Sequence, residues 1–301
     1  MENEIKNLLK EKGPLTGSEL SEAIEMDKLL LWRLCMTDPD LILQTVGTKY
    51  MRLDRRVEGF ARLSPSILRE FLTYTVIGLS ENEIQVEERA LSINRHIEQI
   101  SKTKSDLAYR IVSALETNLD SEISLRDQAC FIIAGDIVYN MAHDVPRPER
   151  STGKLVRGSD MDLVVIVKQD FSENMMKRLD DMIFQEKYRL LSTPHIREEI
   201  DYIVKKPDRV KEQMRFDTFK HMLACKILRE GTRLYGSEDL FHSIKKMLRD
   251  YGVIQKLEAM EQQALEFREK AISYLLKEDP QKIKQESQFL FYPTDESEEF
   301  E

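Results

Sequence analysis

Two carboxylates one residue apart, Asp160 and Asp162, stand at the start of an aliphatic run at positions 163–167. β-Branched residues suit a strand that is buried on both faces, and side chains two residues apart in a strand point to the same side. Asp160 and Asp162 should therefore project together, with Met161 opposite. Neighbouring carboxylates repel each other unless a cation lies between them, and Mg²⁺ prefers oxygen ligands. The pair predicts a metal site, although two solvated acids at a strand start would show the same short pattern.

Two more strands are predicted around this pair. Residues 129–134 are apolar and predict a buried strand that ends at Gly135 and Asp136. Residues 198–204 predict another strand, in which alternation places Asp201 on the face opposite its apolar neighbours. Asp201 is either a third carboxylate of the same site or an exposed acid on an edge strand.

The loop at residues 145–158 is irregular and basic. It contains two prolines and two glycines, and its net charge is +3 in an acidic protein. Its charged residues are Arg147, Arg150, Lys154 and Arg157 against Glu149. Ser159 stands beside Asp160, where one role would be to cap the turn.

The order of these features resembles the core of the polymerase-β-like nucleotidyltransferase superfamily. That core has a glycine and a small residue after one strand, two carboxylates around an apolar residue on the next, and a third carboxylate on a neighbouring strand. The corresponding positions here are Gly135-Asp136, Asp160-Met161-Asp162 and Asp201. The later segments Arg229-Glu230-Gly231 and Leu234-Tyr235-Gly236 are also similar, so the resemblance covers about residues 128–240.

The resemblance implies transfer of a nucleoside monophosphate from an NTP to an acceptor hydroxyl with two Mg²⁺ or Mn²⁺ ions. Asp160 and Asp162 would bridge both ions, and Asp201 would complete the ion nearest the acceptor and help to deprotonate its hydroxyl. The acceptor is left open as a protein, an RNA or a small molecule. The residues implied in nucleotide binding are Gly135, Asp136, Ser159, Lys154, Arg157, Lys220 and Lys226. For the last two, on the helix after Asp201, the alternative is ordinary solvated charge.

Two departures from the superfamily pattern favour a second hypothesis. Asp136 replaces the usual small residue, and its charge would repel a triphosphate unless a metal intervenes. The loop between Asp136 and Asp160 is longer than usual, which suits a substrate-gating loop or a degenerate site. The alternative function is a catalytically inactive, nucleotidyltransferase-like regulatory protein that acts through binding of DNA or protein by its N-terminal segment.

In residues 1–60, three helices are predicted at about 4–12, 16–24 and 27–36, followed by a β-hairpin of residues 41–46 and 49–53. This order of elements resembles a winged-helix domain. In such a domain the third helix enters the major groove, and here it offers Lys28, Trp32 and Arg33. The segment has 9 basic and 11 acidic residues, a net charge of −2, which favours protein docking or a structural role over DNA contact.

The remaining chain predicts a helical connector, a core and a helical end, and the fold class is multidomain α+β. Residues 61–127 form the connector, with helices at 64–79 and about 81–119; the apolar stripe of the second suits a helical bundle or a homodimer seam. The nucleotidyltransferase-like core spans 128–237, with helices at 137–142, 173–188 and 209–229. The C-terminal helical region spans 238–301, with helices at about 238–277, and its acidic tail at 294–301 is expected to be disordered.

Composition excludes several functional classes. The 301 residues are 41% hydrophobic and carry a net charge of −9, which argues against non-specific coating of nucleic acid. The sequence has neither an apolar run long enough for a transmembrane helix nor a signal-peptide pattern. Three cysteines at wide spacings predict reduced core thiols in a cytoplasmic protein, not disulfides or a zinc site.

Overall fold

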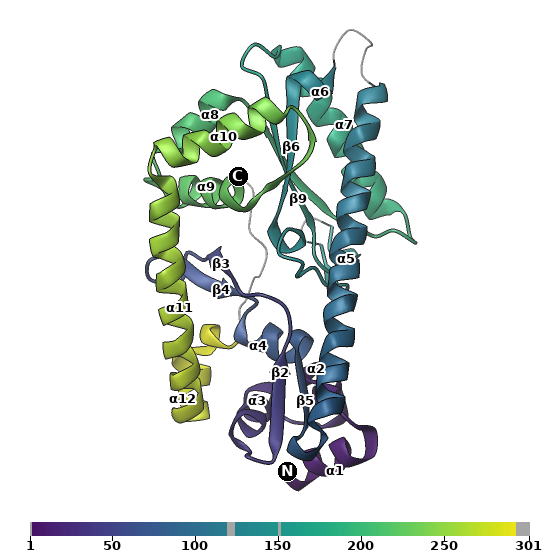
Figure 1. Ribbon diagram of the computed structural model, residues 1–301, viewed down its shortest axis with the longest axis vertical. Coiled ribbons are helices and arrows are strands. Elements are labelled where there is room, and N and C mark those ends of the chain that lie inside the picture. The colour runs from purple at the N-terminus through teal and green to yellow at the C-terminus, as the bar shows by residue number, and fades with distance from the viewer. Residues whose placement is uncertain (1, 119–123, 150–151, 293–301) are drawn as a thin grey trace. The chain divides into compact units, whose positions relative to one another are not determined.

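The computed structural model describes residues 2–118, 124–149 and 152–292 (Figure 1). Within them the chain forms two compact units. The first combines the residues up to His96 with the segment that begins at Met260, and the second spans Ile97–Ala259. The predicted α+β class is confirmed, whereas the division into four segments stays a prediction. Arg150 and the acidic tail at 294–301 lie outside the described residues.

Three short helices and a small antiparallel sheet make up most of the first unit. The helices are α1 (Glu2–Lys12), α2 (Gly17–Ala23) and α3 (Lys28–Thr37), as predicted. α2 begins with a capping box, because the Thr16 side chain accepts a hydrogen bond from the Glu19 backbone N–H and the Glu19 carboxylate accepts one from the Thr16 N–H. The sheet has the order β1-β5-β2, from β1 (Leu15–Thr16), β5 (Thr75–Leu79) and β2 (Leu41–Thr45).

The predicted hairpin of residues 41–46 and 49–53 is wrong. β2 pairs with β5, with Leu41 opposite Leu79, whereas β3 (Tyr50–Leu53) pairs with β4 (Ala61–Ser64). All five residues of β5 are buried, and all except Thr75 are apolar, so β5 gives β2 a more apolar partner than the adjacent strand, which contains Arg52.

β5 also replaces the last five residues of the helix predicted at 64–79. Only a short helical segment forms, from α4 (Ile67–Arg69) and a π-helical turn (Glu70–Tyr74). The strand then begins at three consecutive β-branched residues, whose stiff side chains favour extended backbone, at positions 75–77.

A four-stranded mixed sheet of order β10-β9-β6-β11 is the centre of the second unit. β9 and β10 run parallel, and β6 is antiparallel to both β9 and β11. α7 (Glu173–Ser192) is the crossover that a parallel pair requires. The three strands predicted around the aspartates are confirmed as β6 (Ala129–Ala134), β9 (Met161–Val167) and β10 (Ile200–Lys205). The fourth strand, β11 (Thr232–Gly236), was not predicted.

The long predicted helix is α5 (Glu83–Asn118). Part of its apolar stripe, at Ala108, Ile111, Val112 and Leu115, lies in the same core cluster as the inward residues of β6 and β9. This part of the stripe is therefore a packing face within the second unit, and a homodimer stays a prediction.

Two other predicted helices differ from the structure. The helix predicted at 209–229 is interrupted, giving α8 (Pro207–Gln213) and α9 (Phe219–Glu230). The break contains Phe216 at φ 56°, and Thr218 caps α9 by accepting a hydrogen bond from the His221 N–H. At 137–142, only the end of a 3₁₀ turn (Gly135–Ile137) is helical.

The other elements are short or lie toward the C-terminal end. They are α6 (Leu125–Gln128), the hairpin of β7 (Pro146–Pro148) and β8 (Leu155–Arg157), α10 (Glu238–Asp250), α11 (Val253–Lys277), α12 (Pro280–Glu286) and two 3₁₀ turns, Ser80–Asn82 and Gln288–Leu290. Among the described helices, none has the length and apolarity to cross a membrane. Burial raises the pKa of each cysteine thiol to about 12, in agreement with the predicted core thiols.

Candidate metal centre

The three predicted aspartates come together at one end of the mixed sheet. Asp160 directly precedes β9, Asp162 is its second residue, and Asp201 is the second residue of β10. The parallel register pairs Asp201 with Asp162. One ligand oxygen from each carboxylate lies within 4.8 Å of the others, and all three side chains are partly exposed. The arrangement offers hard oxygen ligands to a divalent cation.

Gly135 makes room for one of these carboxylates. It follows β6, whose last residue, Ala134, pairs with Asp162. Its φ is +72°, and a Cβ atom at this position would lie 2.2 Å from Oδ2 of Asp162. A side chain here would be strained by the backbone conformation and would displace the Asp162 carboxylate. The glycine at the end of the first strand therefore leaves room for one carboxylate of the candidate metal centre.

Ser159 and Asp136, two predicted nucleotide-binding residues, bind each other. The Ser159 hydroxyl donates to the Asp136 carboxylate at 2.7 Å and accepts from the His143 backbone N–H at 3.2 Å. Ser159 is buried. These contacts tie Ser159 to the segment that follows β6, and the carboxylate of Asp136 accepts a hydrogen bond there. Both roles predicted for Ser159 stay predictions.

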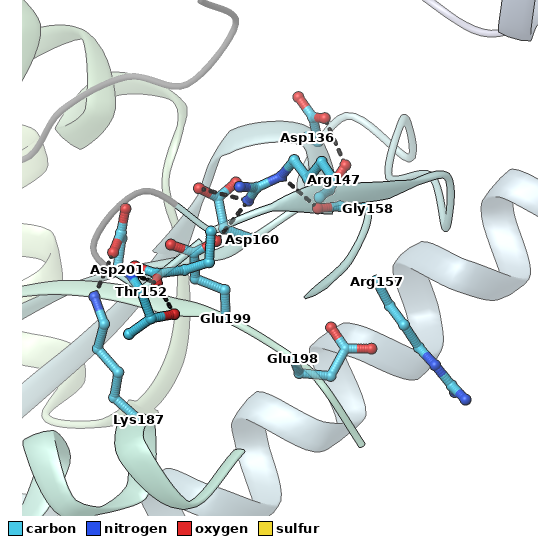
Figure 2. A network of polar contacts seen from close by, with 12 residues as sticks. Asp136, Arg147, Thr152, Arg157, Gly158, Asp160, Lys187, Glu198, Glu199 and Asp201 are labelled. Atoms are coloured by element: carbon cyan, nitrogen blue, oxygen red, sulfur yellow. Dashed lines mark hydrogen bonds and ion pairs between the residues drawn. The ribbon is translucent and has the colours of Figure 1, made fainter. Parts of the chain in front are cut away.

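Two cations from outside the triad reach its carboxylates (Figure 2). Arg147, on β7, places Nη2 2.8 Å from Oε2 of Glu199 and 3.4 Å from Oδ2 of Asp160, while its Nε donates to the Gly158 carbonyl at 2.7 Å. Lys187, on α7, places Nζ 2.7 Å from Oδ1 of Asp201. The sequence showed Arg147 only as part of a basic loop, and it carried no signal for Lys187.

Glu199 is a fourth carboxyl group of the cluster, which the sequence analysis missed. It is 4% exposed, and burial together with the charge of Asp160 raises its pKa to about 7, although Arg147 acts in the opposite direction. The signal that would have found it is strand alternation, because Glu199 lies two residues before Asp201 and hence on the same side. Its neighbour Glu198 instead pairs with Lys104.

The raised pKa of Glu199 predicts a pH-dependent stability. The folded protein binds this proton more tightly than the unfolded chain does, so the free energy of unfolding falls as the pH rises from about 4.5 to about 7, and levels off above. We expect the wild type to lose up to about 3 kcal/mol over this window relative to Glu199→Gln. Urea unfolding at several pH values, in EDTA, measures the difference. The exposed Glu258 on α11 provides the control Glu258→Gln, and parallel profiles for the wild type and Glu199→Gln would contradict the assignment.

The remaining predicted nucleotide-binding cations are spread over the unit. Lys226 is 2% exposed and pairs with Glu230 at 3.0 Å. Lys220 is exposed on another face of α9, since six residues turn a helix by about 240°. Nζ of Lys154 lies 5.9 Å from the centre of the Tyr188 ring. Arg157 points away from Asp160 and Asp201 in Figure 2.

Fold and site together define an α+β protein whose mixed sheet carries a cluster of three aspartates, a possible carboxylate metal site. No protein-family model matches the sequence, and no curated protein matches it either. The functional argument therefore depends on the geometry of this cluster and on its immediate neighbours.

Proposed function

We propose that the protein is a nucleotidyltransferase that transfers a nucleoside monophosphate from an NTP to an acceptor hydroxyl. The observation that carries the proposal is the meeting of Asp160, Asp162 and Asp201 on adjacent parallel strands, with one oxygen of each within 4.8 Å of the others. The order of strands and acidic residues resembles the polymerase-β-like superfamily, and the close packing of Gly135 on Asp162 supports the same assignment.

The donor set fits divalent cations. Asp160, Asp162 and Asp201 would hold Mg²⁺ or Mn²⁺, because carboxylate oxygens are the preferred ligands of both and partial exposure leaves an entry path. When bound, two such ions stabilise the attacking and leaving oxygens of the displacement.

The protein's own groups would position the reactants. Asp201, on the edge strand of the sheet, would accept the proton of the acceptor hydroxyl as its oxygen bonds to the α-phosphorus and the bond from that phosphorus to the leaving pyrophosphate breaks. Gly135, which lacks a side chain, would let the NTP phosphates approach the backbone beside Asp162. Arg147 and Lys154 would neutralise the phosphates from the β7–β8 hairpin, and the hydrogen bond from Ser159 would reduce the repulsion by Asp136.

A thermal-shift titration with each of the four NTPs and Mg²⁺ tests the proposal. A ligand at about 100 times its Kd should stabilise the protein by roughly 2.7 kcal/mol, which is visible as a shift of a few degrees. We expect a Mg²⁺-dependent shift with one nucleotide, lost in the Asp160→Ala/Asp162→Ala variant. If no nucleotide shifts the wild type, the proposal fails. A positive result also identifies the donor to label when the acceptor (a protein, an RNA or a small molecule) is sought.

The second candidate is a regulatory protein without catalysis. It is favoured by the ion pairs of Lys187 and Arg147, which already balance part of the acidic charge. Of the three side chains predicted to face DNA, Trp32 is buried and Arg33 donates to the carbonyls of Leu275 and Glu278, whereas Lys28 is exposed. Mg²⁺-dependent turnover of any NTP would rule this candidate out.

A further inference from the structure

Two carboxylates of the candidate metal centre form ion pairs with cationic side chains of the same chain. Lys187 contacts Asp201 at 2.7 Å, and Arg147 contacts Asp160 at 3.4 Å (Figure 2). The two cations thus lie on the two aspartates that flank Asp162. Each is a cation placed on oxygen ligands that a divalent ion would also use.

Both cations are supported by fixed elements. Lys187 projects from α7, which is capped by Ser172 at its start and buries Ile183 and Leu190 on either side of Lys187. Arg147 is held at two further points, by the Gly158 carbonyl and by the carboxylate of Glu199. The ammonium and guanidinium groups are therefore positioned by the fold, with 22% and 27% of their side chains exposed.

The charges of the cluster set the conditions for metal binding. Four carboxylates, from Asp160, Asp162, Glu199 and Asp201, face two cations within the described part of the cluster. An incoming divalent ion is attracted by the acids but repelled by Lys187 and Arg147 at short range, where little water screens the interaction. Two divalent ions would leave an excess of positive charge, which the phosphates of a nucleotide can neutralise.

We propose that Lys187 and Arg147 compete with the divalent ion for Asp201 and Asp160, so that the ion binds tightly only together with a nucleotide whose phosphates accept the displaced cations. The nucleotide half of this inference rests on the proposed function. The competition half concerns the metal alone and holds whether or not the protein is an enzyme.

Binding of Mn²⁺ to the full-length protein, measured by electron paramagnetic resonance without nucleotide, tests the competition. Lys187→Gln should bind Mn²⁺ about tenfold more tightly than the wild type, because a positive charge beside the ligands is removed. Lys187→Arg, which keeps the charge, should stay near the wild-type Kd. Lys177→Gln removes the same charge about 15 Å away on the same helix and should also leave the Kd unchanged.

A fluorescent NTP analogue at saturating Mn²⁺ tests the nucleotide half. Lys187→Gln and Arg147→Gln should each bind the analogue several-fold more weakly than the wild type, although both bind Mn²⁺ alone more tightly. Opposite changes in the two affinities are not expected from a residue that only maintains structure. Arg147→Gln also covers the case in which Lys187→Gln does not fold.

The outcomes separate this inference from the proposed function. Equal Mn²⁺ affinities of the wild type, Lys187→Gln and Arg147→Gln would overturn the competition. Tighter Mn²⁺ binding with unchanged binding of the analogue would overturn the role of the phosphates. If the wild type binds no nucleotide while Lys187→Gln still binds Mn²⁺ more tightly, the proposed function and the nucleotide half fail together and the competition stands.

Discussion

Asp162→Asn is expected to lower NTP turnover at least about a thousandfold while the fold is kept, because metal ions contribute several kcal/mol of transition-state stabilisation and each 1.36 kcal/mol is tenfold in rate. Asp162 lies at the centre of the cluster, opposite Asp201 in the parallel register and against Gly135. Asparagine keeps the shape of the side chain but removes its charge. Pyrophosphate release from the NTP that binds is the measurement of turnover.

The fold should survive this change because Asp162 is only partly buried and the substitution adds no volume. The thermal midpoint is therefore expected to stay within a few degrees of the wild type. Asp170→Asn serves as the matched control, since Asp170 is exposed beyond the opposite end of β9, roughly 20 Å away. Pyrophosphate release at the wild-type rate by Asp162→Asn would contradict the assignment of Asp162 to the metal site. An equal loss of turnover in Asp170→Asn would show that the effect is not local.

The aspartate cluster was predictable because strand alternation acts over two residues. The aliphatic run at 163–167 requires a strand, and a strand places Asp160 and Asp162 on one side. The same rule relates Glu199 to Asp201. No short-range sequence pattern specifies the register that pairs Asp162 with Asp201. The prediction that Asp201 joins the other two aspartates came from the superfamily resemblance.

The cations of the site were not predictable in the same way. Lys187 pairs with Asp201 across 14 residues, from a helix to a strand that it packs against. Such a pair depends on side-chain reach in the folded protein, and a lysine on an amphipathic helix has no distinguishing pattern. The hairpin error in the first unit has a related cause. β2 pairs with the distant β5 and not with β3, the next strand in the sequence. Pairing between strands that are far apart in the chain leaves no short-range pattern in the sequence.

Lys226→Met should destabilise the protein by about 3–5 kcal/mol, because it removes the cation that pairs with the buried carboxylate of Glu230. Both side chains of the pair are 3% exposed. Glu230 also accepts hydrogen bonds from the Tyr139 hydroxyl at 2.9 Å and from the Gly135 backbone N–H at 3.2 Å. The pair therefore holds the turn that follows β6, next to the carboxylate cluster. Urea unfolding measures the loss, and the thermal midpoint should fall by roughly 10 °C.

The same experiment decides between two roles for Lys226, which the superfamily resemblance implied in phosphate binding. If its role is to neutralise Glu230, then Lys226→Met/Glu230→Gln should recover much of the lost stability, because the unpaired charge is gone. Lys220→Met, on the exposed face of α9, should change stability little. If Lys226→Met instead keeps the wild-type stability and raises the KM for the NTP, then the Lys226 ammonium group separates from Glu230 and binds a phosphate of the NTP. In that case the hydrogen bonds from Tyr139 and Gly135 would still hold Glu230.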